Sequence, residues 1–570
     1  MSRFQDSPET QRYDYQAIAR HYRVRPLKVI ARALVIIWSF AGVVIGLQFD
    51  RWRNASDQQF LKRAAQLRET LTHLGPTYIK IGQALSTRAD LIRKDFLEEL
   101  TKLQDQLPPF PTPLAFSIIE DELDRSIDEV YSEISSVPVA AASLGQVYKA
   151  KLFNGDDVAV KVQRPNLMPK LTLDLYLLRW AAGWIAPYLP LNLGHDLTLI
   201  VDEFGTKLFE EVDYLHEGRN AERFAANFQN NPRVKVPSIY WRFSNHHVLT
   251  LEWIDGCKLT DIKRIKQAGL DSDQLIEIGV TSGLQQLLEF GFFHADPHPG
   301  NLFAMPDGRM AYIDFGMMDL LSEETKGYLV DSVVHLINKE YDQLARDFVN
   351  LGFLTEDTDI TPIIPALEAV FDKAIGESVG DFNFKTITDD FSELVYQYPF
   401  RVPAKFALII RSLVTQEGLA LSINPSFKIV EVAYPYVARR LLTEETPEFR
   451  RRLIEILFKD GKFQWHRLEN LIAIAQTREN LDLLPAAQLG FQYLMSEEGQ
   501  FLRLQIINAL TEDDRLHTEE VGRLWNLVKG ELKPSNIISA AWGAFTEFSV
   551  EQAASLLPSV PSFVDAKTPN

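Results

Sequence analysis

The stretch from His294 to Asn301, followed thirteen residues later by Asp314-Phe315-Gly316, constrains the fold of this chain more than any other feature. It brings two carboxylates and one amide, from Asp296, Asn301 and Asp314, in a fixed order. Each of these residues alone would usually be a helix cap or a turn residue. Together they are hard oxygen ligands that suit Mg²⁺, the ion that neutralises a triphosphate during phosphoryl transfer. The combination predicts a site for a magnesium-bound nucleotide.

The same residues keep the spacing of two protein-kinase motifs. In H-R-D-L-x-x-x-N the Asp lies near the attacking hydroxyl group and the Asn binds magnesium, while the Asp of D-F-G holds magnesium against the phosphates. Asp296, Asn301 and Asp314 occupy these positions. Upstream, Lys161 ends the stretch Val-Ala-Val-Lys, which matches the strand whose lysine reaches the α and β phosphates.

The phosphate-binding loop departs from the protein-kinase pattern. The segment from Ala140 to Val147 fits G-x-G-x-x-G-x-V only with Ala140 and Ala142 in place of the first two glycines. An alanine methyl group obstructs the close approach of backbone to phosphate. We therefore expect a different nucleotide pose, a preference for another nucleotide, or a failure to reach transfer geometry.

Further departures concern the substrate. Ala295 replaces the Arg that would receive an activation-loop phosphate, His298 replaces a common Lys, and no A-P-E motif follows Gly316. Without that peptide-docking platform, phosphorylation of proteins in trans is disfavoured, and a small or lipid substrate, or ATP hydrolysis, is favoured. His294 and His298 also permit a transition-metal site, but both are explained as scaffolding of the catalytic loop.

Three signatures extend the pattern: Lys80-Ile81-Gly82-Gln83 matches K-x-G-Q, Ala140-Ala141-Ala142-Ser143 matches an alanine-rich loop, and Glu211-Val212-Asp213 matches E-x-D. With them, the stretch from roughly Phe60 to Leu320 resembles the UbiB/ADCK atypical kinase-like proteins, which support coenzyme Q and other prenylquinone metabolism. The resemblance implies Mg²⁺ and ATP, with ADP as the alternative nucleotide. It implies a membrane lipid or quinone precursor and quinone-biosynthesis enzymes as partners.

The resemblance also assigns roles to single residues. It implies that Asp296 is the catalytic-loop acid, that Asn301 and Asp314 bind the metal, and that Lys161 pairs with Glu217. The nucleotide-binding residues that it implies are Ala140, Ala141, Ala142, Ser143, Val147, Lys161, Glu217, Glu252 and Ile254. Of these, the stretch from Glu252 to Ile254 would be the hinge between the lobes, near adenine.

The K-x-G-Q helices, by the same resemblance, lie over the cleft where a peptide would dock. Lys80 would meet the acids of E-x-D. The resemblance thus implies that Lys80 is a catalytic residue, as are Lys161 and Asp296. It also implies a regulatory group that consists of Lys80, Gln83, Glu211 and Asp213. The spacing supports part of this, because Lys80 and Gln83 share one helical face after Pro76, although solvated side chains would show the same spacing.

The E-x-D acids and the distance to Glu217 carry two further expectations. Glu211 and Asp213 diverge on a regular helix, so one of them is expected to cap a helix, and a purely structural ion-pair role stays open for both. Glu217 follows Lys161 by 56 residues, further than in ordinary protein kinases. A helical insertion from about Pro169 to Thr206 is therefore expected.

Charge and cysteine content exclude some classes of protein. The net charge of −18 repels a phosphate backbone, so nucleic acid is excluded as a partner. The single cysteine, Cys257, cannot form an internal disulfide, and we expect it to be a small packed residue.

The N-terminal region carries a membrane signal without an export signal. From Ala33 to Phe49 there are 17 residues without charge, with cations on both sides. This length is at the lower limit for a span, so a single span, anchoring at the membrane surface and burial inside the protein all remain open. The tail from Ile537 to Phe563 is a second weakly charged segment. We expect a non-secreted, membrane-associated protein, and Lys459 to Leu471 resembles the plastid and cyanobacterial branch of the family, which favours a thylakoid or plastid lipid-droplet membrane.

The order of elements predicts an α+β chain with a bilobal protein-kinase-like fold. The expected parts are a basic and apolar membrane segment (1–54), a K-x-G-Q helical extension (55–110), a small lobe with a helical insertion (111–255), a large lobe (256–445) and a C-terminal helical extension (446–570). The predicted function is an ATP-binding, magnesium-dependent atypical kinase or ATPase that acts at a membrane in prenylquinone metabolism. The alternatives are a non-catalytic, nucleotide-switched scaffold for membrane enzymes and, third, a protein serine/threonine kinase.

Overall fold

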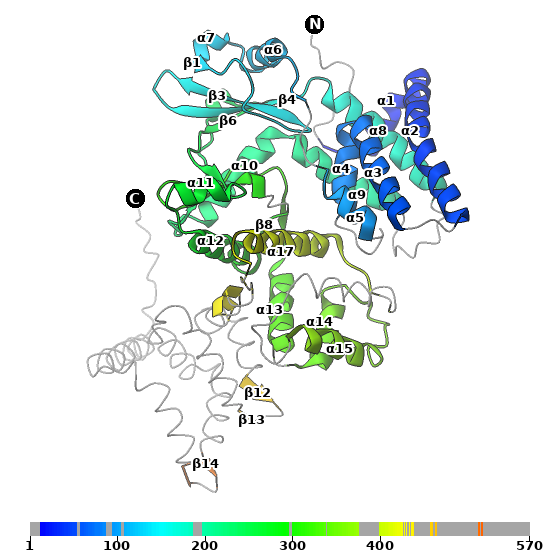
Figure 1. The fold of residues 1–570 in the computed structure, drawn as a ribbon, viewed down its shortest axis with the longest axis vertical. Helices are drawn as coiled ribbons and strands as arrows, with labels where there is room; N and C mark the ends of the chain where they lie inside the picture. The colour runs from blue at the N-terminus through cyan, green and yellow to red at the C-terminus, as the bar shows by residue number, and fades with distance from the viewer. Residues whose placement is uncertain are drawn as a thin grey trace, which may run out of the picture. The chain divides into compact units, whose positions relative to one another are not determined.

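The computed structural model describes residues 12–53, 57–86, 94–103, 108–185, 197–295, 299–337, 339–375 and 400–425, and a few further residues between 398 and 516. The chain divides into two compact units, Met1–Ile429 and Val430–Asn570. Nearly all described residues belong to the first unit (Figure 1). In the second, the described strand pairs are β12 (Phe458–Lys459) with β13 (Lys462–Phe463) and β14 (Thr511–Glu512) with β15 (Arg515–Leu516). The predicted tail segment, and most of the segment from Lys459 to Leu471, lie outside the described residues.

A five-stranded antiparallel sheet forms the small lobe, in the order β1-β3-β4-β6 with β2 paired to β3. Its strands are β1 (Tyr131–Ile134), β2 (Ala140–Ala141), β3 (Gly145–Leu152), β4 (Asp157–Gln163) and β6 (Val248–Glu252). The turn Asn154-Gly155-Asp156 joins β3 to β4, and Gly155 adopts the positive φ of 93° that such a turn favours.

Strand β4 shows how this sheet divides core from site. Val158, Val160 and Val162 are fully buried and pack on α6 (Thr112–Leu123), which is joined to β1 by α7 (Ile127–Val130). Because side chains alternate along a strand, Lys161 lies on the opposite face. Two valines of the core thus fix the direction of the lysine between them.

The large lobe contains a four-stranded and a two-stranded sheet. There, β5 (Val234–Lys235), β10 (Met310–Tyr312), β9 (Leu302–Ala304) and β7 (Cys257–Lys258) form a four-stranded sheet, and β11 (Met318–Leu320) pairs with β8 (Phe292–His294). The described helices of this lobe are α11 (Ile262–Gln267), α12 (Ser272–Gln285), α13 (Glu323–Ile337), α14 (Tyr341–Asn350), α15 (Ile363–Ile375) and α17 (Ala404–Ile423). Short helical turns lie at Trp241–Phe243, Gln286–Phe290 and Pro299–Asn301.

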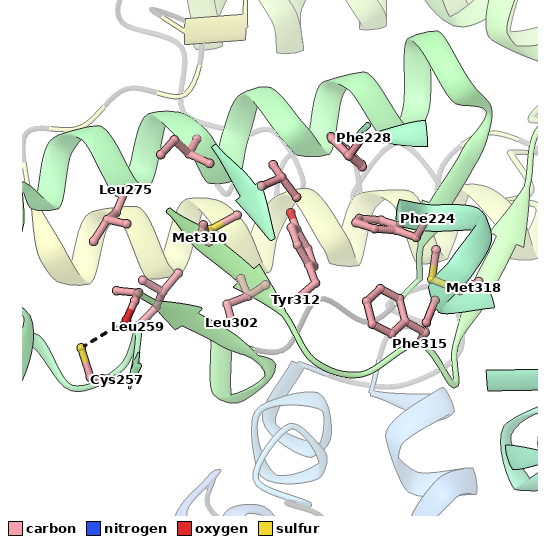
Figure 2. Packing of buried hydrophobic residues seen from close by; sticks show 14 of the residues in the cluster. Phe224, Phe228, Cys257, Leu259, Leu275, Leu302, Met310, Tyr312, Phe315 and Met318 are labelled. Carbon is pink, nitrogen blue, oxygen red and sulfur yellow. Dashed lines mark hydrogen bonds between the residues drawn. The ribbon is translucent and has the colours of Figure 1, made fainter. Parts of the chain in front are cut away.

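An apolar core packs against the phenylalanine of D-F-G. Figure 2 shows the ring of Phe315 beside Phe224 and near Tyr312, with Cys257 at the far end of the cluster. The Phe224 ring centroid lies 4.9 Å from that of Tyr312 and 5.3 Å from that of Phe315. Cys257 is buried and its thiol lies 3.8 Å from the Ala304 carbonyl oxygen, so it is the packed residue expected from the sequence. The core thereby ties the helix of Phe224 to the strand that leads into D-F-G.

Helices from two separate stretches of the chain pack together beside the small lobe (Figure 1). The N-terminal stretch contributes α1 (Tyr15–Arg23), α2 (Pro26–Trp52), α3 (Asp57–Leu74), α4 (Pro76–Leu85) and α5 (Lys94–Leu100). The predicted insertion contributes α8 (Leu167–Ile185) and α9 (Leu197–Val212), and α10 (Tyr214–Asn227) follows. Ile18 and Tyr22 of α1 share a core with Leu171 and Leu175 of α8 and with Leu208 of α9. The N-terminal extension therefore packs on the insertion.

The charge-free segment from Ala33 to Phe49 lies within α2. Two described helices are long and apolar enough to cross a membrane: Pro26–Trp52, with 11% of its apolar window buried, and Lys405–Ile423, with 39% buried. The second packs against α12 of the large lobe, as a core helix does. The first is the more exposed of the two.

Candidate functional site

Three elements bring Lys161, Glu217 and Asp314 together between the two lobes. The Lys161 ammonium group pairs with Glu217 Oε1 and lies 3.7 Å from Asp314 Oδ1. The pair of Lys161 with Glu217 spans 56 residues of sequence, as the resemblance implied. Strand β4 supplies the lysine, the first turn of α10 supplies Glu217, and the segment after β10 supplies Asp314.

The start of α10 places Glu217. Asp213 caps this helix, because its carboxylate accepts a hydrogen bond of 3.0 Å from the Leu215 backbone N–H. The capping role expected for one acid of E-x-D thus belongs to Asp213. Four residues later, Glu217 lies in the buried interior, with 5% of its side chain exposed. Asn220, one turn further on, donates to the Phe315 carbonyl oxygen at 3.0 Å.

The charges of the cluster depend on one another. Burial alone would lower the pKa of Lys161, but Glu217 and Asp314 outweigh it and raise that pKa, so Lys161 is an ammonium ion. Burial raises the pKa of Glu217 to about 7, against the opposing effect of Lys161. Burial would also raise the pKa of Asp314, but the Lys161 ammonium, His294 and the Gly316 N–H hold it well below its usual range. Asp314 is therefore an anion whenever the cluster is intact.

Asn301 and Asp314 fit the predicted metal ligands. The Asn301 amide donates to Asp314 Oδ2 at 3.0 Å, and Gly316 N–H donates to Asp314 Oδ1 at 3.2 Å. With 41% of its side chain exposed, Asp314 is open to solvent, although the adjacent Phe315 is buried. An ionised carboxylate beside an amide is a donor set that suits Mg²⁺. Asp296 and His298 lie outside the described residues, so their roles remain predictions.

His294 is part of the scaffold of this site. Its Nε2 lies 2.9 Å from the Asp314 carbonyl oxygen, and its backbone N–H donates to the Gln286 side chain at 2.9 Å. These contacts agree with the scaffolding role expected from the sequence. Gln286 and Asn220 also support the site, and neither was predicted from the sequence. For Asn220 the sequence contained one signal, because this residue follows Glu217 by three positions and therefore lies on the same helical face.

The alanine-rich loop consists of β2 and the start of the turn to β3. Ala140 pairs with Val147 and Ala141 with Gln146, while the Ala142 N–H donates to the Gly145 carbonyl oxygen at 2.8 Å. Val147 in turn lies opposite Lys161 in the sheet. Of the predicted nucleotide-binding residues in this segment, Val147 therefore lies beside the strand of the lysine, while Ala140 and Ala141 lie one strand further away. Ser143 is 1% exposed, so its side chain is buried.

Two side chains missed by the sequence analysis hold this loop. Arg164 Nε donates to the Ala142 carbonyl oxygen at 3.0 Å, and its Nη2 donates to the Pro108 carbonyl oxygen at 2.9 Å. The Gln146 side chain both accepts from and donates to the backbone of Phe110, at 3.1 and 3.2 Å. The linker from the helical extension is therefore bonded to the loop.

Substitution of Gly145 by Ala is expected to destabilise this loop. A Cβ atom at Gly145 would lie 2.5 Å from the Val162 carbonyl oxygen and 2.4 Å from the Tyr214 hydroxyl oxygen, so β3 must shift. We expect the free energy of unfolding to fall by about 1–3 kcal/mol, measured by urea denaturation. The matched control is Gly418→Ala in α17, where nothing lies within 4 Å and the change is expected to be neutral or stabilising. Equal stability of the two variants would contradict the tight fit.

The K-x-G-Q helix reaches the D-F-G turn through one ion pair. Lys80 in α4 is 7% exposed and pairs with Glu211 of α9. Glu211 in turn lies beside the D-F-G turn, because a Cβ atom added at Gly316 would be 3.5 Å from Glu211 Cγ. This is the contact between Lys80 and E-x-D that the resemblance implied. Gln83, by contrast, donates to the Leu103 carbonyl oxygen at 3.0 Å, beyond the end of α5. The contact of Gln83 with Leu103 therefore holds the extension together.

The chain segment after β6 is the crossing between the lobes. Glu252 ends the strand of the small sheet, and Ile254, 8% exposed, precedes β7 of the large sheet. The Glu252 carboxylate binds Lys235 at 2.7 Å and the Ser238 N–H at 3.0 Å. The position agrees with the hinge predicted at Glu252 to Ile254, while contact of these residues with adenine stays a prediction.

Comparison with known proteins fits this geometry. The ABC1 atypical kinase-like domain matches residues 102–348, and the UbiB helical domain matches residues 367–428. An uncharacterized Synechocystis protein, slr1919, is 66% identical over 96% of this chain and 97% of its own length. Arabidopsis thaliana Protein ACTIVITY OF BC1 COMPLEX KINASE 1, chloroplastic, is 46% identical over 89% of this chain and 76% of its own length. The solved structure of the Rv3197–erythromycin complex from Mycobacterium tuberculosis is 27% identical, with a TM-score of 0.46 over 64% of this chain and 93% of that chain. The resemblance and the bilobal kinase-like α+β fold are confirmed, and the chain belongs to the ABC1 atypical kinase-like family.

Proposed function

We propose that this chain is a magnesium-dependent, ATP-binding atypical kinase or ATPase that acts at a membrane in prenylquinone or related isoprenoid-lipid metabolism. The observation that carries the nucleotide chemistry is the cluster of Lys161, Glu217 and Asp314, in which an ammonium ion lies 3.7 Å from an ionised, partly exposed carboxylate. In kinase-like enzymes this arrangement binds phosphates and their metal ion.

The residues of the site have separate tasks in this proposal. Asp314 and Asn301 would hold Mg²⁺, which neutralises the charge of the phosphates when it is bound. Lys161, fixed by Glu217, would bind phosphate oxygens, and the alanine-rich loop would cover them. Asp296 would accept the proton of an attacking hydroxyl group or water molecule. The methyl groups of Ala140 and Ala142 favour a phosphate pose unlike that of a glycine loop, so ADP stands as the alternative nucleotide.

The membrane setting has two supports. Helix α2 is long, apolar and little buried, and relatives of this chain are cyanobacterial or chloroplastic proteins. The quinone connection comes from the family resemblance. On this basis we propose a thylakoid or plastid-type membrane, with a membrane lipid or quinone precursor as substrate and enzymes of quinone biosynthesis as partners.

The test is nucleotide binding and hydrolysis by the purified full chain, with and without Mg²⁺ and with and without liposomes. The liposomes contain a prenylated phenol as the quinone precursor. We expect magnesium-dependent hydrolysis that rises when liposomes and precursor are present. Loss of nucleotide binding altogether would overturn the proposed site.

Two other outcomes would favour the alternatives. Nucleotide binding without hydrolysis, and without response to membranes, would favour the nucleotide-switched scaffold. Transfer of the γ-phosphate to a protein substrate in trans would favour the protein serine/threonine kinase.

A further inference from the structure

Helix α2 has two faces of opposite character. Its outer face carries exposed apolar side chains along the whole helix, with exposures that include 82% for Leu27, 84% for Trp38, 68% for Ile45 and 78% for Trp52. Its other exposed large apolar residues are Ile30, Leu34, Val35, Ile37, Val44 and Phe49. Leu27, Trp38, Ile45 and Trp52 recur at intervals of seven or eleven residues, so they lie on one stripe of the helix.

The opposite face is fixed to the protein at both ends. Arg32 donates from Nε and Nη2 to both carboxylate oxygens of Asp174 in α8, at 2.7 and 2.9 Å. Asp50, near the other end, accepts from Arg63 in α3 at 2.6 Å. The Asp174 and Asp50 side chains are 2% and 8% exposed. Detachment of α2 would leave these buried carboxylates without their partners, which is costly.

The helices before and after α2 also contact the same body. In α1, the Tyr22 hydroxyl group donates to the Pro169 carbonyl oxygen of α8 at 2.9 Å. Helix α3 follows α2 and packs along it. A 27-residue helix is about 40 Å long, so a span would place α1 and α3 on opposite sides of the bilayer. Since both pack on one folded unit, the helix does not span.

The charges around α2 identify what covers its outer face. Between Arg12 and Arg53 there are eight Arg and Lys residues against two Asp residues, in a chain whose net charge is −18. The exposed cations of this stretch flank the apolar stripe in the sequence: Arg12, Arg20 and Arg23 precede α2, Lys28 is in its first turn, and Arg51 and Arg53 are at its C-terminal end. Cations at the ends of an apolar stripe reach headgroups when a helix lies flat in a membrane interface.

We infer that α2 lies in the plane of the membrane and inserts its outer face into an anionic lipid surface. This assigns one occupant to the stripe, and it decides between the span and the surface anchor that the sequence left open. The inference rests on the proposed membrane setting, but it requires no nucleotide binding or hydrolysis.

The first experiment measures flotation of the full chain with vesicles of equimolar phosphatidylglycerol and phosphatidylcholine. We expect binding to these vesicles, much weaker binding to phosphatidylcholine alone, and loss of binding by about tenfold or more in Trp38→Glu and in Ile45→Glu. The matched control is Phe153→Glu, because Phe153 is 67% exposed on the turn between β3 and β4. Circular dichroism and nucleotide binding of the variants should match the wild type. Equal loss in the control, or none in the α2 variants, would overturn the docking face.

The second experiment decides orientation. Cysteine is introduced at Gln16 or at Arg53, one on each side of α2, in a Cys257→Ala background, and intact membranes are treated with an impermeant maleimide. We expect both sites to react from the same side of the membrane. Reaction from opposite sides would overturn the in-plane orientation and leave the membrane setting standing. Failure of the wild type to float would instead count against that setting itself, and hydrolysis assays without lipid would still test the nucleotide site.

Discussion

Asp314→Asn is expected to lower magnesium-dependent nucleotide hydrolysis by at least about a hundredfold. The amide nearly preserves shape, and one oxygen remains for the Asn301 amide to bind. What is lost is the negative charge that would hold the metal ion and that faces Lys161 at 3.7 Å. The measurement is phosphate release at saturating Mg²⁺ and nucleotide, with nucleotide binding followed separately.

Asp307→Asn is the matched control for this variant. Asp307 lies in the turn between β9 and β10, half of its side chain is exposed, and its contacts are local, with the Arg309 N–H at 3.1 Å and Nε at 2.8 Å. Hydrolysis by this control should equal that of the wild type. A loss below about threefold for Asp314→Asn would show that this carboxylate does not hold the catalytic metal ion.

Lys161→Met is expected to lower both hydrolysis and stability. The variant leaves the Glu217 carboxyl group, 5% exposed, without its cation. Removal of one partner of a buried pair costs about 3 kcal/mol of unfolding free energy, as measured by urea denaturation at neutral pH. Lys149→Met is the control, because the ion pair of Lys149 with Asp157 is more than 40% exposed on both sides and contributes little.

The pH dependence of this variant has a definite sign. Burial raises the pKa of Glu217 to about 7 even with Lys161 present, and removal of the lysine raises that pKa further. A carboxyl group with a raised pKa holds its proton in the folded state but loses it in the unfolded state, so stability falls as pH rises. We expect Lys161→Met to lose stability between about pH 5 and pH 8. The double variant Lys161→Met with Glu217→Gln should regain most of the stability, lose this pH dependence, and stay inactive. An inactive but fully stable single variant would contradict the burial argument.

The sequence predicted the chemical centre because kinase motifs record spacing along the chain. Lys161 follows from the Val-Ala-Val-Lys motif, and Asp314 with Asn301 from the order of the catalytic loop and D-F-G. The pairing of Lys161 with Glu217 rested on the family resemblance, and the structure confirms it. For Lys161, Asn301 and Asp314, one local pattern contained most of the information.

The remaining contacts join residues that no local pattern connects. Arg164 binds the carbonyl group of Pro108, 56 residues away, and Arg32 binds Asp174, 142 residues away. The sequence shows an arginine in or beside an apolar run, but the partner becomes known only when the helices pack. For the same reason the sequence could not decide whether the charge-free stretch of α2 spans a membrane, lies at its surface or is buried in the protein. The hydropathy of the stretch is the same in all three cases.

The shared core of α1 and α8 cannot form until α8 has been synthesised. Tyr22 and Thr172, whose hydroxyl groups lie 2.9 Å apart, are separated by 150 residues. At about 5–20 residues per second, α8 leaves the ribosome roughly 8–30 s after α1. During that interval α1 and α2 have been made, but the surface that will bury them has not. The most apolar helix of the described N-terminal region is thus available to a lipid bilayer or a chaperone before its own protein can cover its inner face.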